Sequence, residues 1–370
     1  MITPVRHSAR PPALLRRPGL GVRLGVRLGV RLGVRLGVRL WLLCGLALCG
    51  MLISQAAWAS GDAGELLDTG RADEALRVLA PQAGGGNAAA LNYLGRVYFT
   101  LGDWDNALRS CERAAQLEPR NAIFQLWLGR SYGEKARVSN PVYAYVLARK
   151  TVASFITAHT LDRENMAIAR DLAEYYASAP AIVGGGVGKA LALADEVAAE
   201  HPSDAAWIRA RATYSEGQFD EAERQYREAV RLDHDSATSI LDLARFQRGR
   251  KDWDGFERSI QRALNSGQVR PIDRYSAAEL LFKTDRNLDE ATRQMRSYIQ
   301  SGHTDEEAPL FRAHFLLGEI YLKSGDTNQA ASEYRAALAL ASSYRPAAEA
   351  LRRLGQNTGQ SLGKNLGTGQ

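Results

Sequence analysis

The segment GGGVGKA, residues 184–190, is the part of this sequence that comes nearest to a catalytic motif. A phosphate-binding loop needs a glycine directly before its lysine, a second glycine five residues earlier, and a serine or threonine directly after the lysine. Gly188 and Lys189 meet the first requirement, but Val183 and Ala190 occupy the other two positions. We therefore predict that this segment is a turn that precedes a helix, and that it binds no phosphate.

Other residues with chemical potential are scattered along the chain. The six histidines form neither an H-E-x-x-H pair nor a cluster with cysteine, which are spacings typical of zinc sites. No serine-centred turn and no pair of carboxylates indicates a nucleophile or an acid–base couple. The sequence thus predicts no catalytic residue, no cofactor and no metal. One alternative stays open, an enzyme or solute-binding component with a pocket near residues 136–190, whose candidate polar groups are Tyr143, Tyr145, Tyr175, Tyr176 and Lys189.

The positive charge of the chain is concentrated at its N-terminus. The formal net charge is +6 at pH 7, but residues 1–59 contain nine arginines and no acidic residue. The remaining residues therefore hold 38 of the 47 basic side chains and all 41 acidic ones, a net charge of −3. Basic patches on the folded part are the electrostatic sign of nucleic-acid binding. We consequently expect no nucleic-acid partner.

Residues 1–59 have the layout of a secretory signal. Five copies of GVRL supply a positive region, an apolar stretch follows at residues 40–53, and the triplet AWA at 57–59 matches the small-residue cleavage rule. The apolar stretch is shorter than the roughly 20 residues that cross a bilayer. We expect cleavage after this triplet and export to the periplasm. Two alternatives remain: an inner-membrane anchor formed by residues 40–58, which would give membrane association, and a lipoprotein attached through Cys49.

Beyond residue 60 the chain shows a helical pattern that repeats. Apolar residues recur three and four positions apart, and no alternating strand pattern is present. The segment LNYLGRVYFTLGDWDNALRSCERAAQLEP, residues 91–119, has the spacing W-x2-L-G-x2-Y with leucine in place of tryptophan, and a second copy begins at His314. These segments resemble the tetratricopeptide repeat, a helix–turn–helix unit of about 34 residues.

The resemblance covers residues 65–354 in about seven units of uneven quality. It implies an all-α fold, an α-α superhelix or solenoid over residues 60–354, in which stacked hairpins bury apolar surface that no single hairpin can bury. Cys111 stands at a large-residue packing position and is predicted to be a buried, unreactive thiol. The tail, residues 355–370, is rich in glycine, glutamine and asparagine, and we expect it to be disordered.

Two segments interrupt the repeat. In the first, Pro141 is expected to begin a new and longer helix after Asn140, because proline is favoured in the first turn of a helix. In the second, the proline and glycines of ASAPAIVGGGVG, residues 177–188, are expected to form a loop between two helices.

A binding surface is expected on the groove formed by the first helices of successive repeats. Residues one place beyond the packing positions should face this groove. Their mixture of aromatic, aliphatic and charged side chains is typical of a surface that binds a protein or peptide. The candidate partner-binding residues are Asn92, Arg96, Phe99, Leu126, Arg130, Phe315, Glu319 and Leu322.

The sequence therefore favours a non-enzymatic exported scaffold or adaptor that mediates protein–protein interaction at the bacterial cell envelope. Its mechanism would be passive, since a rigid curved surface would hold an extended segment or a helix of a partner. An inner-membrane-anchored protein with periplasmic repeats is the first alternative. The enzyme or solute-binding component described above is the second.

Cleavage of the signal can be tested directly. N-terminal sequencing of the exported protein is expected to begin at Ser60, because the AWA triplet places the cleavage site directly before it. An intact N-terminus on the exported protein would contradict the prediction and favour the anchor.

Overall fold

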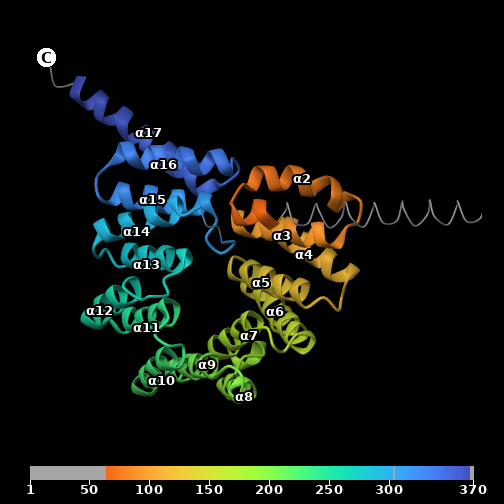
Figure 1. The fold of residues 1–370 in the computed structure, drawn as a ribbon. Helices are drawn as coiled ribbons and strands as arrows, with labels where there is room; N and C mark the ends of the chain where they lie inside the picture. The colour runs from red at the N-terminus through yellow and green to blue at the C-terminus, as the bar shows by residue number, and fades with distance from the viewer. Residues whose placement is uncertain (1–63, 303–304, 367–370) are drawn as a thin grey trace, which may run out of the picture. The chain divides into compact units, whose positions relative to one another are not determined.

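The computed structural model describes residues 64–302 and 305–366, and in this part of the chain the fold is all-α without a strand. Consecutive helices lie side by side along the array (Figure 1). The predicted α-helical solenoid is confirmed. The helices are α2 (Ala72–Gly84), α3 (Ala88–Leu101), α4 (Trp104–Leu117), α5 (Ala122–Arg137), α6 (Pro141–Leu161), α7 (Met166–Ser178), α8 (Val187–Val197), α9 (Pro202–Ser215), α10 (Phe219–Leu232), α11 (Ala237–Arg250), α12 (Trp253–Leu264), α13 (Pro271–Lys283), α14 (Leu288–Gln300), α15 (Leu310–Lys323), α16 (Thr327–Leu340) and α17 (Arg345–Leu366), with a 3-10 turn η1 (Ala181–Val183) before α8.

The helices form hairpin pairs from α3–α4 to α15–α16, and we call the first member of each pair a first helix. Short polar side chains start many of them by accepting a hydrogen bond from a free backbone N–H of the first turn. Asn87 caps α3 in this way, and Asp103 caps α4. Gly102, between these two helices, has a φ of 76°, a left-handed conformation that glycine adopts without strain.

The pairs are held together by close contacts between a first-helix glycine and a large side chain of the second helix. A Cβ atom added to Gly95 would lie 2.4 Å from the sulfur of Cys111, and one added to Gly318 would lie 2.5 Å from the ring of Tyr334. Both large residues are fully buried. Burial raises the pKa of the Cys111 thiol to about 12, while a hydrogen bond from Ser131 has the opposite effect. The prediction of a buried thiol is confirmed.

Both expected interruptions of the repeat are confirmed. Asn140 caps α6 by accepting a hydrogen bond from the N–H of Tyr143 at 3.0 Å, and Pro141 is the first residue of this helix. The second interruption is shorter than predicted: residues 179–186 connect the two helices, and residues 187–190, which were predicted to lie in the turn, form the first turn of α8.

The C-terminal tail differs from the prediction. We expected disorder from residue 355, but α17 continues to Leu366. The physical reason is that propagating a helix costs far less than nucleating one. The docked start of α17 supplies the nucleus, and no proline follows Pro346 to stop it.

A buried apolar cluster joins the N-terminal and C-terminal helices of the described chain. It contains Leu79 of α2 and Val97 of α3 together with Phe311 of α15 and Ala337 of α16. The backbone N–H of Ser342 also donates to the carboxylate of a residue in α2, Asp73, at 2.9 Å. These contacts join residues more than 200 positions apart, which no local sequence pattern reveals.

The predicted signal at residues 1–59, including the apolar stretch, lies outside the described residues. Among the helices that the structure describes, none has the length and hydropathy needed to cross a membrane.

The close glycine contacts lead to a stability prediction. Gly318→Ala would push a methyl group into the buried ring of Tyr334, and overpacking of this kind costs about 1–3 kcal/mol. Chemical denaturation is expected to show this loss. Gly188→Ala in α8 is the control, because an added Cβ meets no atom within 4 Å there. An equal effect of the two substitutions would contradict the packing account.

Candidate interaction groove

Arginine side chains recur on the first helices at a fixed place in the repeat. Arg96 in α3 and Arg130 in α5 each follow the glycine that contacts the second helix, in the shared triplet LGR. A residue one position along a helix is rotated by about 100°. The glycine therefore faces the paired helix, and the arginine lies on an adjacent face.

Arg96 is bound by a carboxylate from a distant part of the chain. Its Nε donates to Glu306 at 2.6 Å, and its Nη2 donates to the second carboxylate oxygen. Only about 16% of the Arg96 side chain and 14% of the Glu306 side chain are exposed. The guanidinium carbon also lies 4.6 Å from the ring centre of Tyr93 and 5.2 Å from that of Trp127. The planar guanidinium of Arg96 thus lies near two aromatic rings and donates to both oxygens of the Glu306 carboxylate.

Arg130 has a related environment. Its Nε donates to Asp171 of α7 at 2.5 Å, and its guanidinium carbon lies 4.7 Å from the ring centre of Trp127. A second carboxylate, Glu307, stands 3.9 Å from its Nη2. Trp127 is therefore flanked by both arginines, and each arginine faces an acidic residue of the segment before α15.

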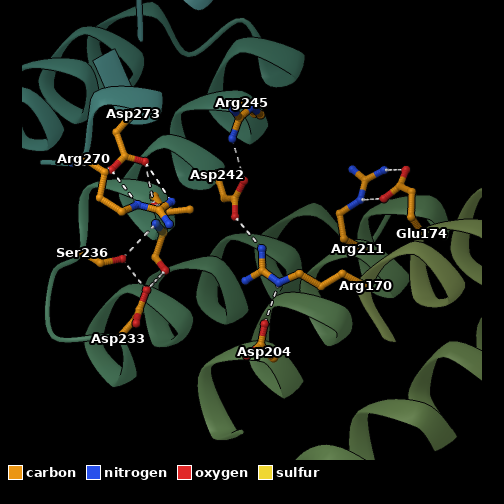
Figure 2. A network of polar contacts seen from close by, with 12 residues as sticks. Arg170, Glu174, Asp204, Arg211, Asp233, Ser236, Asp242, Arg245, Arg270 and Asp273 are labelled. Atoms are coloured by element: carbon orange, nitrogen blue, oxygen red, sulfur yellow. Dashed lines mark hydrogen bonds and ion pairs between the residues drawn. The ribbon is translucent and has the colours of Figure 1, made fainter. Parts of the chain in front are cut away.

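The ion pairs continue along α7, α9 and α11 (Figure 2). Arg170 of α7 donates to Asp204 of α9 at 2.6 Å and also contacts Asp242 of α11 at 3.5 Å. Asp242 in turn accepts from Arg245 at 2.8 Å. In the same region Arg211 of α9 donates to both carboxylate oxygens of Glu174 in α7. The distance between its Nε and Oε2 of Glu174 is 2.5 Å.

The network extends to the start of α13. The carboxylate of Asp273, which is 3% exposed, accepts from the hydroxyl of Thr238 in α11 at 2.8 Å and from the backbone N–H of Arg270 at 2.9 Å. Adjacent first helices are thus linked by side-chain charges as well as by apolar packing.

Electrostatics keeps these arginines charged. Burial alone disfavours the charge of Arg96, but the hydrogen bond and the charge of Glu306 raise its pKa above the ordinary value. The pKa of Arg130 is raised by Asp171 in the same way, against the effect of burial. The pKa of Arg170 is raised by Asp242 and Asp204. Arginine is protonated at every physiological pH, so these first helices carry permanent cations that require anionic partners.

A cavity of about 510 Å³ lies beside the two LGR arginines, and we call it the groove. Its aromatic walls are Phe99, Trp127, Phe155 and Tyr175, and Phe99 and Trp127 meet edge to face with ring centres 5.4 Å apart. Its charged lining residues are Arg130, Glu134, Asp171, Glu174, Glu306, Glu307 and Arg312. Apolar surface and fixed charges therefore meet in one concave site.

The predicted partner-binding residues are distributed unevenly over this region. Phe99 and Arg130 line the groove, and Arg96 lies beside it through its contacts with Trp127 and Glu306. Phe315 lines a second cavity, bounded by α13 and α15. Glu319 accepts a hydrogen bond from the hydroxyl of a buried tyrosine, Tyr334, at 2.5 Å, and Leu322 is exposed. The last two do not line the groove.

Two of the predicted residues are corrected by the structure. We expected Asn92 and Leu126 to face a partner, but they are only 1% and 4% exposed. Leu126 packs in the apolar cluster of α6 and α7 with Phe155 and Leu172, because this part of α5 is covered by the long helix α6. Asn92 lies one turn before Arg96, and its buried amide nitrogen has no hydrogen-bond partner among the described residues.

The candidate groups of the alternative pocket differ in their surroundings. Tyr143 and Tyr145 are exposed on α6. The hydroxyl of Tyr175 lies 2.6 Å from the carbonyl of Ala148 and 2.9 Å from that of Val183. Burial raises the pKa of both Tyr175 and its neighbour, Tyr176. The last candidate, Lys189, donates to the carbonyl of Gly184 at 2.8 Å. Within the described residues, no group of three or more potential metal ligands is found.

Sequence reasoning missed the acidic segment before α15. Asp305, Glu306 and Glu307 form an acidic run in a connection between helices, and such runs are usually solvated. The contact of Glu306 with Arg96 spans 210 residues, so no spacing rule could reveal it.

Comparison with known proteins identifies the repeat. The model of the family "Tetratricopeptide repeat" matches residues 88–121 and 311–344. No curated protein matches the chain significantly.

Solved structures with the same kind of repeat cover much of the chain. A tetratricopeptide repeat protein of Parabacteroides merdae shares 18% identity over 72% of this chain and 98% of its own, with a TM-score of 0.37. A thermophilic TPR protein of Thermus thermophilus shares 19% over 52% of this chain and 98% of its own, with a TM-score of 0.42. YrrB, described as a TPR protein with an unusual peptide-binding site, shares 16% over 54% of this chain and 99% of its own, with a TM-score of 0.35.

The ion-pair network makes a testable prediction about stability. Arg170→Met keeps the apolar stem that lies against Trp207 but leaves Asp204 and Asp242 without this cation. Both carboxylates are at most 15% exposed, so the expected loss is roughly 1–3 kcal/mol in urea unfolding.

Arg231→Met on the exposed face of α10 is the matched control. Arg231 pairs with Glu228 in solvent, where water and salt screen the pair, so little or no loss of stability is expected. Equal losses of stability in the two variants would show that the ion pairs of Arg170 contribute no more to stability than a pair on the surface.

Proposed function

We propose, from the premise that this chain is a tetratricopeptide-repeat protein, that it is a non-enzymatic scaffold at the bacterial cell envelope whose groove holds a segment of a partner protein. Tetratricopeptide repeats imply protein–protein interaction in general. The groove and the export to the envelope are the more specific parts of the proposal.

The observation that carries the proposal is the combination of a cavity with fixed cations. A volume of about 510 Å³ is enough for one or two side chains, and it is walled by Phe99 and Trp127. Arg130 at its edge remains charged and can bind a carboxylate or a carbonyl oxygen. Aromatic and arginine side chains are the types that contribute most to binding at protein interfaces. A bound segment would place an apolar side chain in the cavity and polar groups against the arginines.

The location at the envelope rests on the N-terminal sequence. A positive region, a short apolar stretch and an AWA triplet follow one another in residues 1–59. Cleavage would release the repeats into the periplasm, whereas a retained segment at residues 40–58 would anchor them to the inner membrane. Either outcome places the groove on the outer side of that membrane.

Site-specific photo-crosslinking tests the groove. A photoreactive amino acid at position 99 is expected to capture a protein partner in intact cells, because Phe99 lines the cavity. The matched control places the same amino acid at position 116, since Gln116 is exposed on α4, the second helix of the same pair. Mass spectrometry of the adduct would locate the captured segment.

The two positions distinguish the alternatives. Equal capture at positions 99 and 116, or capture at position 116 alone, would contradict a partner in the groove. The solute-binding alternative gains support if no protein is captured while a small molecule from the cell extract raises the melting temperature. Residues of α6 and α7, among them Thr151 and Tyr175, also line this cavity, so a solute would bind at the same place.

A further inference from the structure

The groove contains a segment of the same chain. Residues 305–308, with the sequence DEEA, lie between α14 and α15 and contribute Glu306 and Glu307 to the groove lining. We call these four residues the acidic segment. Glu306 is the partner of Arg96, and Glu307 lies near Arg130. The two arginines that the sequence nominated for partner binding are thus contacted by the chain itself.

The acidic segment is held in place from both sides. On one side, the two carboxylate oxygens of Glu306 accept hydrogen bonds from Nε and Nη2 of Arg96. On the other, Ala308 is fully buried, and its carbonyl accepts a hydrogen bond from the hydroxyl of Tyr298 at 2.5 Å. An isolated buried carboxylate costs several kcal/mol, and only well-made ion pairs and hydrogen bonds offset this. A surface turn would normally leave a glutamate in water, so the burial of Glu306 depends on the site it enters.

The site around Arg96 has the chemistry of carboxylate recognition. Paired N–H groups of a guanidinium match the two oxygens of a carboxylate in geometry as well as in charge. The rings of Tyr93 and Trp127 lie within 5.2 Å of the guanidinium carbon and restrict its orientation.

We propose that residues 305–308 act as an internal ligand of the groove, and that an acidic segment of the partner protein competes with them for Arg96 and Arg130. This inference rests on the proposed function and specifies the partner's chemistry. The partner segment carries one or two adjacent carboxylates for the arginines and an apolar side chain for the cavity. Because the internal ligand is covalently attached, the groove is open only part of the time, and the apparent affinity for a partner is reduced by that fraction.

Charge argues for a short acidic peptide and against a polyanion. Glu134, Asp171 and Glu174 line the same cavity, and they would repel a chain of phosphates. One or two carboxylates need only take the places of Glu306 and Glu307, which already lie beside these arginines in the presence of the acids on α5 and α7. Glu307 shows that partial engagement is feasible, because its side chain is 72% exposed and stands 3.9 Å from Arg130.

The test uses the full-length chain and a fluorescent peptide DEEAPL, which is the sequence of residues 305–310. The double variant E306Q/E307Q weakens the internal ligand and is expected to bind the peptide about tenfold more tightly than the natural chain, which corresponds to about 1.4 kcal/mol. Arg96→Met in the double variant is expected to abolish this gain. The peptide DQQAPL, without the two carboxylates, is expected not to bind.

Two further variants serve as controls. Glu200→Gln removes an exposed acid at the end of the α8–α9 turn and is expected to leave the affinity unchanged. Glu307→Gln alone alters an exposed side chain, which cannot unfold the protein, and is expected to tighten peptide binding by a smaller factor than the double variant. Circular dichroism melting of each variant confirms that it is folded.

Equal peptide affinity of the natural chain and E306Q/E307Q would overturn the internal-ligand proposal. So would binding that survives Arg96→Met, or equal binding of DQQAPL. If the peptide does not bind while the photoreactive group at position 99 still captures a protein, the proposal of an acidic competitor is wrong, but the groove remains the proposed binding site. Failure of both would remove the proposed function as well.

Discussion

The groove depends on one electrostatic constraint, which is that each buried arginine on the first helices needs a carboxylate partner. Close packing at Gly95 and Gly129 draws each hairpin together and leaves the next residue, an arginine, on an adjacent face. These guanidinium groups stay protonated, so each needs an anion within reach. On α7, α9 and α11 the anions come from neighbouring helices, as Arg170 and Asp204 show. For Arg96 the carboxylate comes from a connection 210 residues away.

The sequence predicted the features that rest on local pattern. The repeat spacing fixes which residues meet within a hairpin. The glycine and large-residue positions of the repeat therefore predicted the contacts of Gly318 with Tyr334 and of Gly95 with Cys111. Asn140 and Pro141 predicted the start of α6 for the same local reason. Arg96, Phe99 and Arg130 were found from the helical position after the packing residue.

Long-range contacts could not be predicted in this way. Leu126 was assigned to the groove, but α6 and α7 cover it, and their longer connection is not part of the repeat consensus. The continuation of α17 depends on a nucleus that packing supplies and composition does not reveal. The burial of Glu306 depends on the location of α3 relative to the segment before α15. Tertiary placement therefore decided which predicted residues are accessible.

The same arginines have two roles in the proposed function. They offset buried negative charge within the chain, and they are the groups that we propose a partner uses. Within the described residues, Arg96 is paired with Glu306 and Arg130 with Asp171, so their charge is compensated inside the chain. In the proposed competition, specificity would depend on the difference in affinity between the internal acidic segment and that of the partner.

Whether the acidic segment occupies the groove can be measured from the Nε–H signal of Arg96 in a ¹⁵N nuclear magnetic resonance spectrum. In the natural chain the Arg96 Nε–H donates to Glu306, with 2.6 Å between Nε and the carboxylate oxygen, so we expect a resolved signal that exchanges slowly with water. In Glu306→Gln the signal should shift and exchange faster. An Arg96 signal that exchanges rapidly in the natural chain, or that is unchanged by Glu306→Gln, would contradict the claim that the acidic segment occupies the groove.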